Sequence, residues 1–134
     1  MTYAFSAPLQ EAVYQALAGD AALVAIVGAN VFDAMPGGPL PPLYAMLGPE
    51  RVKDASDLTG TAAWHDFAVS VVTDGAGFHT AKQAAAISDA LHDADLALSR
   101  GRLVGLRFVS AQAKRESGGL RRIDLTFRAR VEDN

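Results

Sequence analysis

The segment from Leu120 to Val131 alternates apolar and polar side chains along its whole length. Its apolar members are Ile123, Leu125, Phe127, Ala129 and Val131, and its polar members are Arg122, Asp124, Thr126, Arg128 and Arg130. Successive side chains of a β-strand point to opposite faces, so this pattern predicts a strand with one apolar and one charged face. The chain must therefore build a sheet that is covered on one side only.

The strand that precedes this segment is predicted over Arg102–Arg115, with a turn at Ser117-Gly118-Gly119, because glycine adopts positive φ without steric cost. Together the two strands form a C-terminal β-hairpin. Nine of the twelve Lys and Arg residues lie between Arg100 and Arg130. Residues 1–99 carry a net charge of −8 and residues 100–134 a net charge of +5. Such a molecule is expected to attract copies of itself or a polar partner.

The remaining elements follow from apolar periodicity and from turn residues. We expect helices from Ser6 to Gly19, over Ala21–Val27 and from Phe78 to Ala94, and strands near Val31, over Leu43–Leu47 and over Thr61–Thr73, with Gly48–Gly60 as a turn-rich loop. This order predicts an α+β fold whose mainly antiparallel sheet has its helices packed on one face. The length of 134 residues predicts one domain spanning residues 1–134.

The loop from Met35 to Tyr44 is rich in proline and also apolar, with Leu40 and Leu43 in its second half. Loops normally lie on the surface, and an exposed apolar patch tends to be a binding site. The loop either folds back over the edge of the core or presents Met35, Leu40, Leu43 and Tyr44 to a partner.

Residues capable of chemistry are sparse and scattered. The chain has no cysteine, which removes disulfides and thiolate metal sites and fits a reducing compartment. His65 and Asp66 fall on opposite faces of one strand. His92 can meet Asp89 at i, i+3, but a metal there needs further ligands. We expect no catalytic residue, cofactor or metal. No signal peptide or membrane span is expected, which indicates a protein made in the cytoplasm.

Six arginines of the hairpin are the candidate interface residues. They are Arg107, Arg115, Arg121, Arg122, Arg128 and Arg130. They line either a solvated outer face or a subunit interface, where arginine makes planar contacts. Phe108 and Phe127 point away from the arginines of their own strands, so the pattern disfavours a surface for stacking nucleic-acid bases.

The run Ala22–Phe32, the segment Pro41–Tyr44 that ends the proline-rich loop, and the strand Trp64–Val71 resemble the tail-completion family of tailed phages. The Ala- and Arg-rich composition is similar to that of gene-transfer-agent particles, which carry a relative. The resemblance implies a virion protein without catalytic residues at the head-proximal end of the tail, assembled in the bacterial cytoplasm. It implies a homohexameric ring that caps the tail tube and binds the stopper or connector of the head. DNA would pass through the lumen without sequence-specific binding.

Two other functions stay open at this point. One is a small enzyme or ligand-binding α+β domain that uses Asp66, His65 or the residues around His92. The other is a nucleic-acid-binding module that uses the arginine face of the hairpin. In the ring hypothesis, reversing Arg122, Arg128 and Arg130 to glutamate should block ring formation or tail joining without unfolding the subunit.

Overall fold

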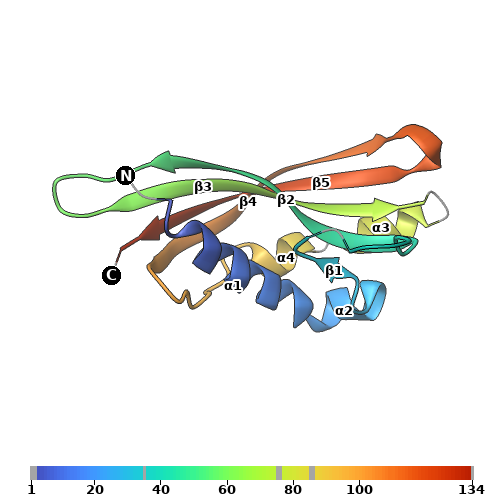
Figure 1. The fold of residues 1–134 in the computed structure, drawn as a ribbon, viewed down its shortest axis with the longest axis horizontal. Helices are drawn as coiled ribbons and strands as arrows, with labels where there is room; N and C mark the ends of the chain where they lie inside the picture. The colour runs from blue at the N-terminus through green and yellow to red at the C-terminus, as the bar shows by residue number, and fades with distance from the viewer. Residues whose placement is uncertain (1–2, 35, 75–76, 85–86, 134) are drawn as a thin grey trace.

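The computed structural model describes residues 3–34, 36–74, 77–84 and 87–133. Within them, the helices are α1 (Ser6–Ala18), α2 (Ala21–Val27), α3 (Phe78–Ala84) and α4 (Ile87–Leu91), and the strands are β1 (Val31–Phe32), β2 (Leu43–Asp54), β3 (Ala62–Thr73), β4 (Arg102–Arg115) and β5 (Arg121–Glu132). The strands form one sheet in the order β1-β2-β3-β5-β4. All neighbours are antiparallel except β1 and β2. The helices lie on one side of this sheet (Figure 1), which confirms the predicted α+β fold.

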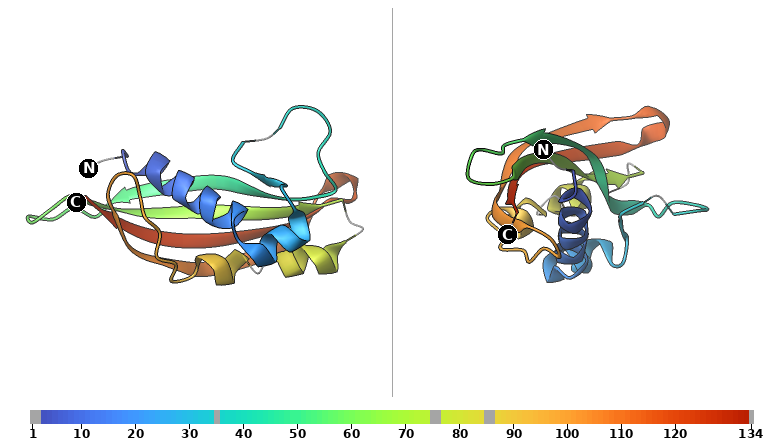
Figure 2. Two further views of the ribbon diagram at one scale, coloured as in Figure 1. Left: turned by 90° about the horizontal axis from the view of Figure 1, so that it is seen from below. Right: turned by 60° about the vertical axis from the view of Figure 1, so that its left-hand side comes forward.

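The N-terminal helices form as their apolar residues and caps predict. Leu9, Val13 and Leu17 recur every fourth residue of α1, and all three are buried against the sheet. The carboxylate of Asp20 accepts a hydrogen bond from the Leu23 N–H at 3.0 Å, and this bond caps the first turn of α2. Both helices lie over the same face of the sheet (Figure 2).

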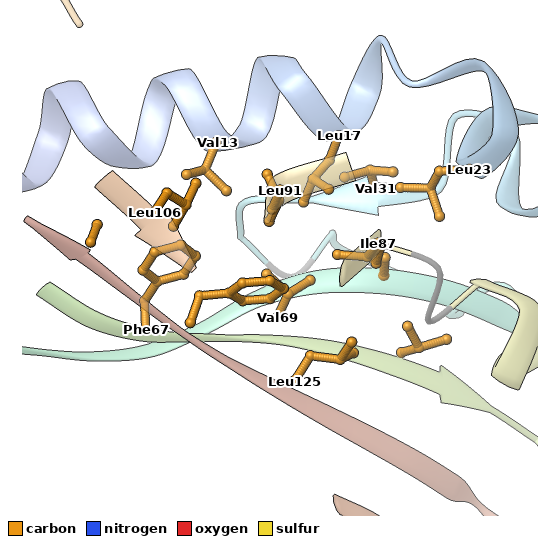
Figure 3. Close-up of a cluster of buried hydrophobic side chains, with 14 of the residues drawn as sticks. Val13, Leu17, Leu23, Val31, Phe67, Val69, Ile87, Leu91, Leu106 and Leu125 are labelled. Carbon is orange, nitrogen blue, oxygen red and sulfur yellow. The ribbon is translucent and has the colours of Figure 1, made fainter. Parts of the chain in front are cut away.

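Strand β5 is an interior strand of the sheet, between β3 and β4, and its predicted alternation is confirmed. The apolar members from Ile123 to Val131 are buried, whereas the polar members are only half-buried. Phe127 lies in register with Phe67 of β3 and Phe108 of β4. The core lies between this face of the sheet and the helices, as the side chains of Val13, Leu106 and Leu125 show (Figure 3).

Strand β2 is longer than predicted. The expectation of a strand ending at Leu47 is wrong, because β2 continues to Asp54 and pairs with β3 as far as Asp54 opposite Ala63. The register shifts between Leu47 and Glu50, where Gly48 and Pro49 form an irregularity. Proline is tolerated at a bulge or on an edge strand, and β2 offers both conditions there.

The helix predicted from Phe78 to Ala94 ends earlier than expected, at Leu91. α3 ends at Ala84, and α4 runs only from Ile87 to Leu91; residues 85–86 lie outside the described residues. Asp93 adopts a positive φ of 58°, and its N–H donates a hydrogen bond to the Leu106 carbonyl at 2.7 Å. Tertiary contact with β4 therefore replaces the last helical turn. Ala84, Ile87 and Leu91 are buried, so this segment packs on the core.

Candidate functional site

The face of the sheet turned away from the helices carries the polar members of the strands. Pairing brings Arg51 of β2 opposite Asp66 of β3, Asp66 opposite Arg128 of β5, and Arg128 opposite Arg107 of β4. Side chains that lie in register across a sheet share a face. One row of the outer face therefore holds three arginines around one aspartate.

The next row places Trp64 of β3 between Lys53 of β2 and Arg130 of β5. The guanidinium carbons of Arg128 and Arg130 lie 4.8 Å and 5.2 Å from the centre of the Trp64 ring. The Arg128 Nε donates to Asp66 at 3.0 Å, and the Arg130 Nε lies 3.5 Å from a Glu132 carboxylate oxygen. Arg128 and Arg130 are thus held by contacts within their own subunit.

Trp64 corrects the expectation that the arginines have no aromatic neighbour. Phe108 and Phe127 do face the helix side, as predicted, but the neighbouring strand supplies Trp64 on the arginine side. The alternation of β3 places Trp64 and Asp66 on one face, yet only the pairing register with β5 reveals which arginines they meet. Because two arginines of the same chain engage the ring, Trp64 is a packed residue rather than an open platform for bases.

A second cluster surrounds Asp124 nearer the hairpin turn. Asp124 accepts hydrogen bonds from the Arg122 Nε at 2.7 Å and from the Ser70 hydroxyl at 2.6 Å, and the Lys114 ammonium lies 3.4 Å away. Burial opposes ionisation of Asp124, but the hydrogen bonds from Arg122 and Ser70 outweigh it and hold the Asp124 pKa below its usual value. Arg122 therefore has a structural role within the subunit.

The remaining candidate arginines are less engaged. Arg107 and Arg115 are exposed and form no ion pair with the described residues. Arg121 lies over the Phe78 ring of α3, with its guanidinium carbon 4.5 Å from the ring centre. Arg51 and Lys53 are likewise exposed and unpaired among the described residues. The sequence reasoning missed both residues, because it ended β2 before it reached them.

The proline-rich loop stands away from the helices and the sheet (Figure 2). Leu40, which belongs to this loop, is 44% exposed. Leu43 is half-buried and Tyr44 is only 7% exposed, because both belong to β2. The Tyr44 ring packs against Phe32, with ring centres 5.8 Å apart. Among Leu40, Leu43 and Tyr44, Leu40 is thus the most exposed, and Met35 lies outside the described residues.

The histidines do not assemble a reactive site. His65 is fully buried, and the described residues give neither ring nitrogen a hydrogen bond. Burial lowers its pKa, although Glu50, 3.9 Å from its Nδ1, counteracts the shift. The Nδ1 of His92 accepts a hydrogen bond from the Phe108 N–H at 3.0 Å. The structure groups no three potential ligands around a metal position within its described ranges.

The charge asymmetry of the sequence becomes an asymmetry between two layers. Residues 1–42 and 74–99 supply the helices and their connections, and they contain seven acidic residues and one basic residue. Residues 43–73 and 100–134 supply nearly all of the sheet, and they contain eight acidic and eleven basic residues. The helix layer is thus net negative and the sheet layer net positive. No helix in the described part of the chain is long and apolar enough to cross a membrane.

The chain is similar to known proteins in both sequence and fold. The model of the family described as "Tail completion protein gp17" matches residues 11–132. A chain of a solved structure described as "Virion of native gene transfer agent (GTA) particle" is similar in both sequence and fold. It shares 62% identity with a TM-score of 0.92, over 98% of this chain and 99% of that chain. A search of curated proteins gave no match.

Proposed function

We propose that this chain, which belongs to the tail-completion family, ends the growth of a phage-like tail and joins that tail to the head. The observation that carries the proposal is the 62% identity, over almost the full length of both chains, to a component of a gene transfer agent particle. Similarity at this level supports a structural role in a particle of the same kind. The scattered histidines of the subunit add no argument for catalysis.

The finer part of the proposal is a closed ring, with six subunits as the expected number, seated on the tail tube and bound by the stopper or connector of the head. Residues 1–134 act in it as one domain. A ring is built from heterologous contacts, in which one side of each subunit meets a different side of the next. The acidic helix layer and the basic sheet layer offer two such complementary surfaces. DNA passes through the lumen without sequence-specific binding.

Deleting this protein from cells that produce the particle tests the function directly. We expect tails of abnormal length or tails without heads in electron micrographs, because nothing closes the tail tube. Expression of the wild-type chain from a plasmid should restore joined particles. Tails of normal length with heads attached, in the absence of the chain, would contradict the proposal.

The proline-rich loop is proposed to contact a neighbouring subunit or the tail tube. Replacing residues 36–42 with a Gly/Ser linker of equal length is expected to reduce head joining while the unfolding midpoint stays close to that of the wild type. The reason is that Leu40 is exposed and takes no part in the core. Joined particles are counted in micrographs.

A matched pair of single substitutions controls for the loss of an exposed leucine. Leu58 is fully exposed in the turn between β2 and β3, so Leu58→Ser removes a leucine of equal size at the other end of the sheet. Leu40→Ser should reduce joining and Leu58→Ser should not. Equal joining by the two variants, together with a functional linker variant, would show that the loop makes no assembly contact.

A further inference from the structure

The edge of β4 is protected along its first half and open along its second. The Leu106 carbonyl accepts a hydrogen bond from the Asp93 N–H at 2.7 Å, and the Phe108 N–H donates to His92 at 3.0 Å. The register also shifts between Leu103 and Gly105 and between Phe108 and Ser110. Covered backbone groups and bulges both prevent a strand from adding to an edge. Residues 110–115 pair regularly with β5 and lack such protection.

The backbone groups that face outward on this open part follow from the ladder. The Glu116 N–H donates to the Leu120 carbonyl at 2.8 Å across the hairpin turn. Opposed residues of antiparallel strands alternate between pairs that exchange hydrogen bonds and pairs that do not. Counting back from Glu116, the N–H and C=O groups of Ala111, Ala113 and Arg115 point away from β5. The described residues place no strand beside them.

The opposite edge of the sheet has a similar open stretch. β1 pairs with β2 only at Ala45 and Met46. Further along, the Ala55 N–H donates to the Ala62 carbonyl at 2.9 Å. The same alternation then turns the N–H and C=O groups of Glu50, Val52 and Asp54 away from β3. The Pro49 irregularity separates this stretch from the part that β1 covers.

We propose that the open edge of β4 in one subunit pairs with the open edge of β2 in the next copy of the chain, so that the sheet continues from subunit to subunit. This inference rests on the proposed ring, and it names the strands that join its members. The two open stretches lie at the two opposite edges of one sheet, so different surfaces of neighbouring copies meet, as a heterologous interface requires. β2 and β4 run in opposite directions within the subunit. A rotated copy therefore brings its β2 antiparallel to β4.

Charge selects the register of this pairing. In the proposed register, Ala111 and Ala113 of one copy lie opposite Val52 and Glu50 of the next copy. Between these pairs, Gln112 lies opposite Arg51 on the outer face. Shifting the strands by two residues in one direction would instead place Lys114 opposite Arg51, and like charges directly opposite each other destabilise a sheet. The same shift would place Arg115 opposite Glu50, but the Glu50 carboxylate already accepts hydrogen bonds from Tyr3 and Ser6. In the chosen register Arg115 lies diagonal to Glu50, where opposite charges attract. Each of the two opposed pairs, Ala111 with Val52 and Ala113 with Glu50, exchanges two backbone hydrogen bonds.

Cysteine cross-linking tests the pairing because the natural chain has no cysteine. Gln112 and Arg51 would form a pair without backbone hydrogen bonds, whose side chains are close enough for a disulfide. Within one subunit, three strand-to-strand steps of roughly 4.8 Å separate β2 from β4 by about 14 Å, and the two positions also lie in different rows of the sheet, which excludes an internal bridge. A chain carrying both Arg51→Cys and Gln112→Cys can therefore bridge only to another copy.

The double variant is assembled into particles, oxidised gently and run on a non-reducing denaturing gel. We expect a ladder of covalent multimers, and we expect chains with either single substitution to remain monomeric. Dimers from Gln112→Cys alone would show β4 pairing with itself and overturn the inference. Normally joined particles without a ladder would also overturn it, while leaving the tail-closing function intact. The deletion experiment above tests that function separately.

A backbone substitution gives a second readout. Ala113→Pro removes an N–H that points away from β5, so the ladder within the subunit is preserved. Ala113→Ser keeps this N–H and serves as the control. The proline variant is expected to yield about tenfold fewer joined particles than the serine variant, since it leaves a carbonyl of the neighbour unpaired. Both variants should unfold at the same denaturant concentration. Equal joining by two such stable variants would overturn the inference.

Discussion

Replacing Phe127 with alanine is expected to lower the free energy of unfolding by about 3–5 kcal/mol. Phe127 is fully buried on the interior strand β5. Its ring stacks on Phe67 with centres 5.6 Å apart and meets the edge of Phe108 at 5.8 Å. Truncation leaves a cavity in the middle of the sheet, which the neighbouring strands cannot close without breaking register. Urea unfolding of the purified chain measures the loss.

Phe108→Ala is the matched control for this substitution. The same side chain is removed one strand away, but Phe108 is 36% exposed on the edge strand β4. Its loss is expected to lower the free energy of unfolding by only about 1–2 kcal/mol, because solvent fills the space. Equal losses for the two variants would mean that burial on β5 does not dominate the stability of the sheet.

Reversing Arg107 and Arg115 to glutamate is expected to abolish most head joining while leaving the subunit folded. Both side chains are exposed and form no ion pair with the described residues, so the free energy of unfolding should change by less than about 0.5 kcal/mol for each. An exposed charge pair contributes on the order of 0–1 kcal/mol. Two reversals per interface therefore weaken each contact by roughly tenfold, and the effect repeats around a closed ring. Electron microscopy of particles gives the joined fraction.

The charge-conserving double variant, Arg107→Lys with Arg115→Lys, is expected to assemble normally. Arg122→Glu supplies the opposite comparison, since it breaks the hydrogen bond to Asp124 and places two carboxylates together. That variant should lose stability as well as assembly. The expectation that reversing Arg122, Arg128 and Arg130 would leave the subunit folded thus needs revision. Normal joining by the glutamate double variant would remove these two arginines from the interface.

Sequence patterns predicted the parts of the fold that depend on local periodicity. The alternation of β5 and the apolar stripe of α1 show directly which side chains meet the core. Gly118 and Gly119 mark the turn of the hairpin. The predicted β2 is too short because Gly48 and Pro49 are turn residues in most contexts. In the structure they lie in an irregularity of an edge strand, and the strand continues beyond them. The helix predicted after Phe78 is too long because a backbone hydrogen bond between Asp93 and β4 overrides the apolar pattern.

The candidate site was predictable by residue type but not by arrangement. Arg122, Arg128 and Arg130 stand out because they alternate with apolar residues along β5. Their partners Asp66, Trp64 and Ser70 lie on β3, more than fifty residues away in the sequence. Pairing register between strands that distant depends on the whole sheet rather than on any local pattern. For the same reason, the sequence could not separate Arg107, which forms no ion pair with the described residues, from Arg128, which is held by Asp66.

The position of β5 in the chain has a consequence for synthesis. β3 and β4 each pair with β5 over nearly their full lengths, and β5 follows both of them in the sequence, so it is synthesised after them. Until it emerges, β3 and β4 have no shared partner and the apolar face of the sheet stays incomplete. The sheet therefore cannot be completed before β5 has been made, and contacts far apart in sequence slow its formation. A chain cut short before residue 121 lacks the strand between β3 and β4 and is expected not to fold.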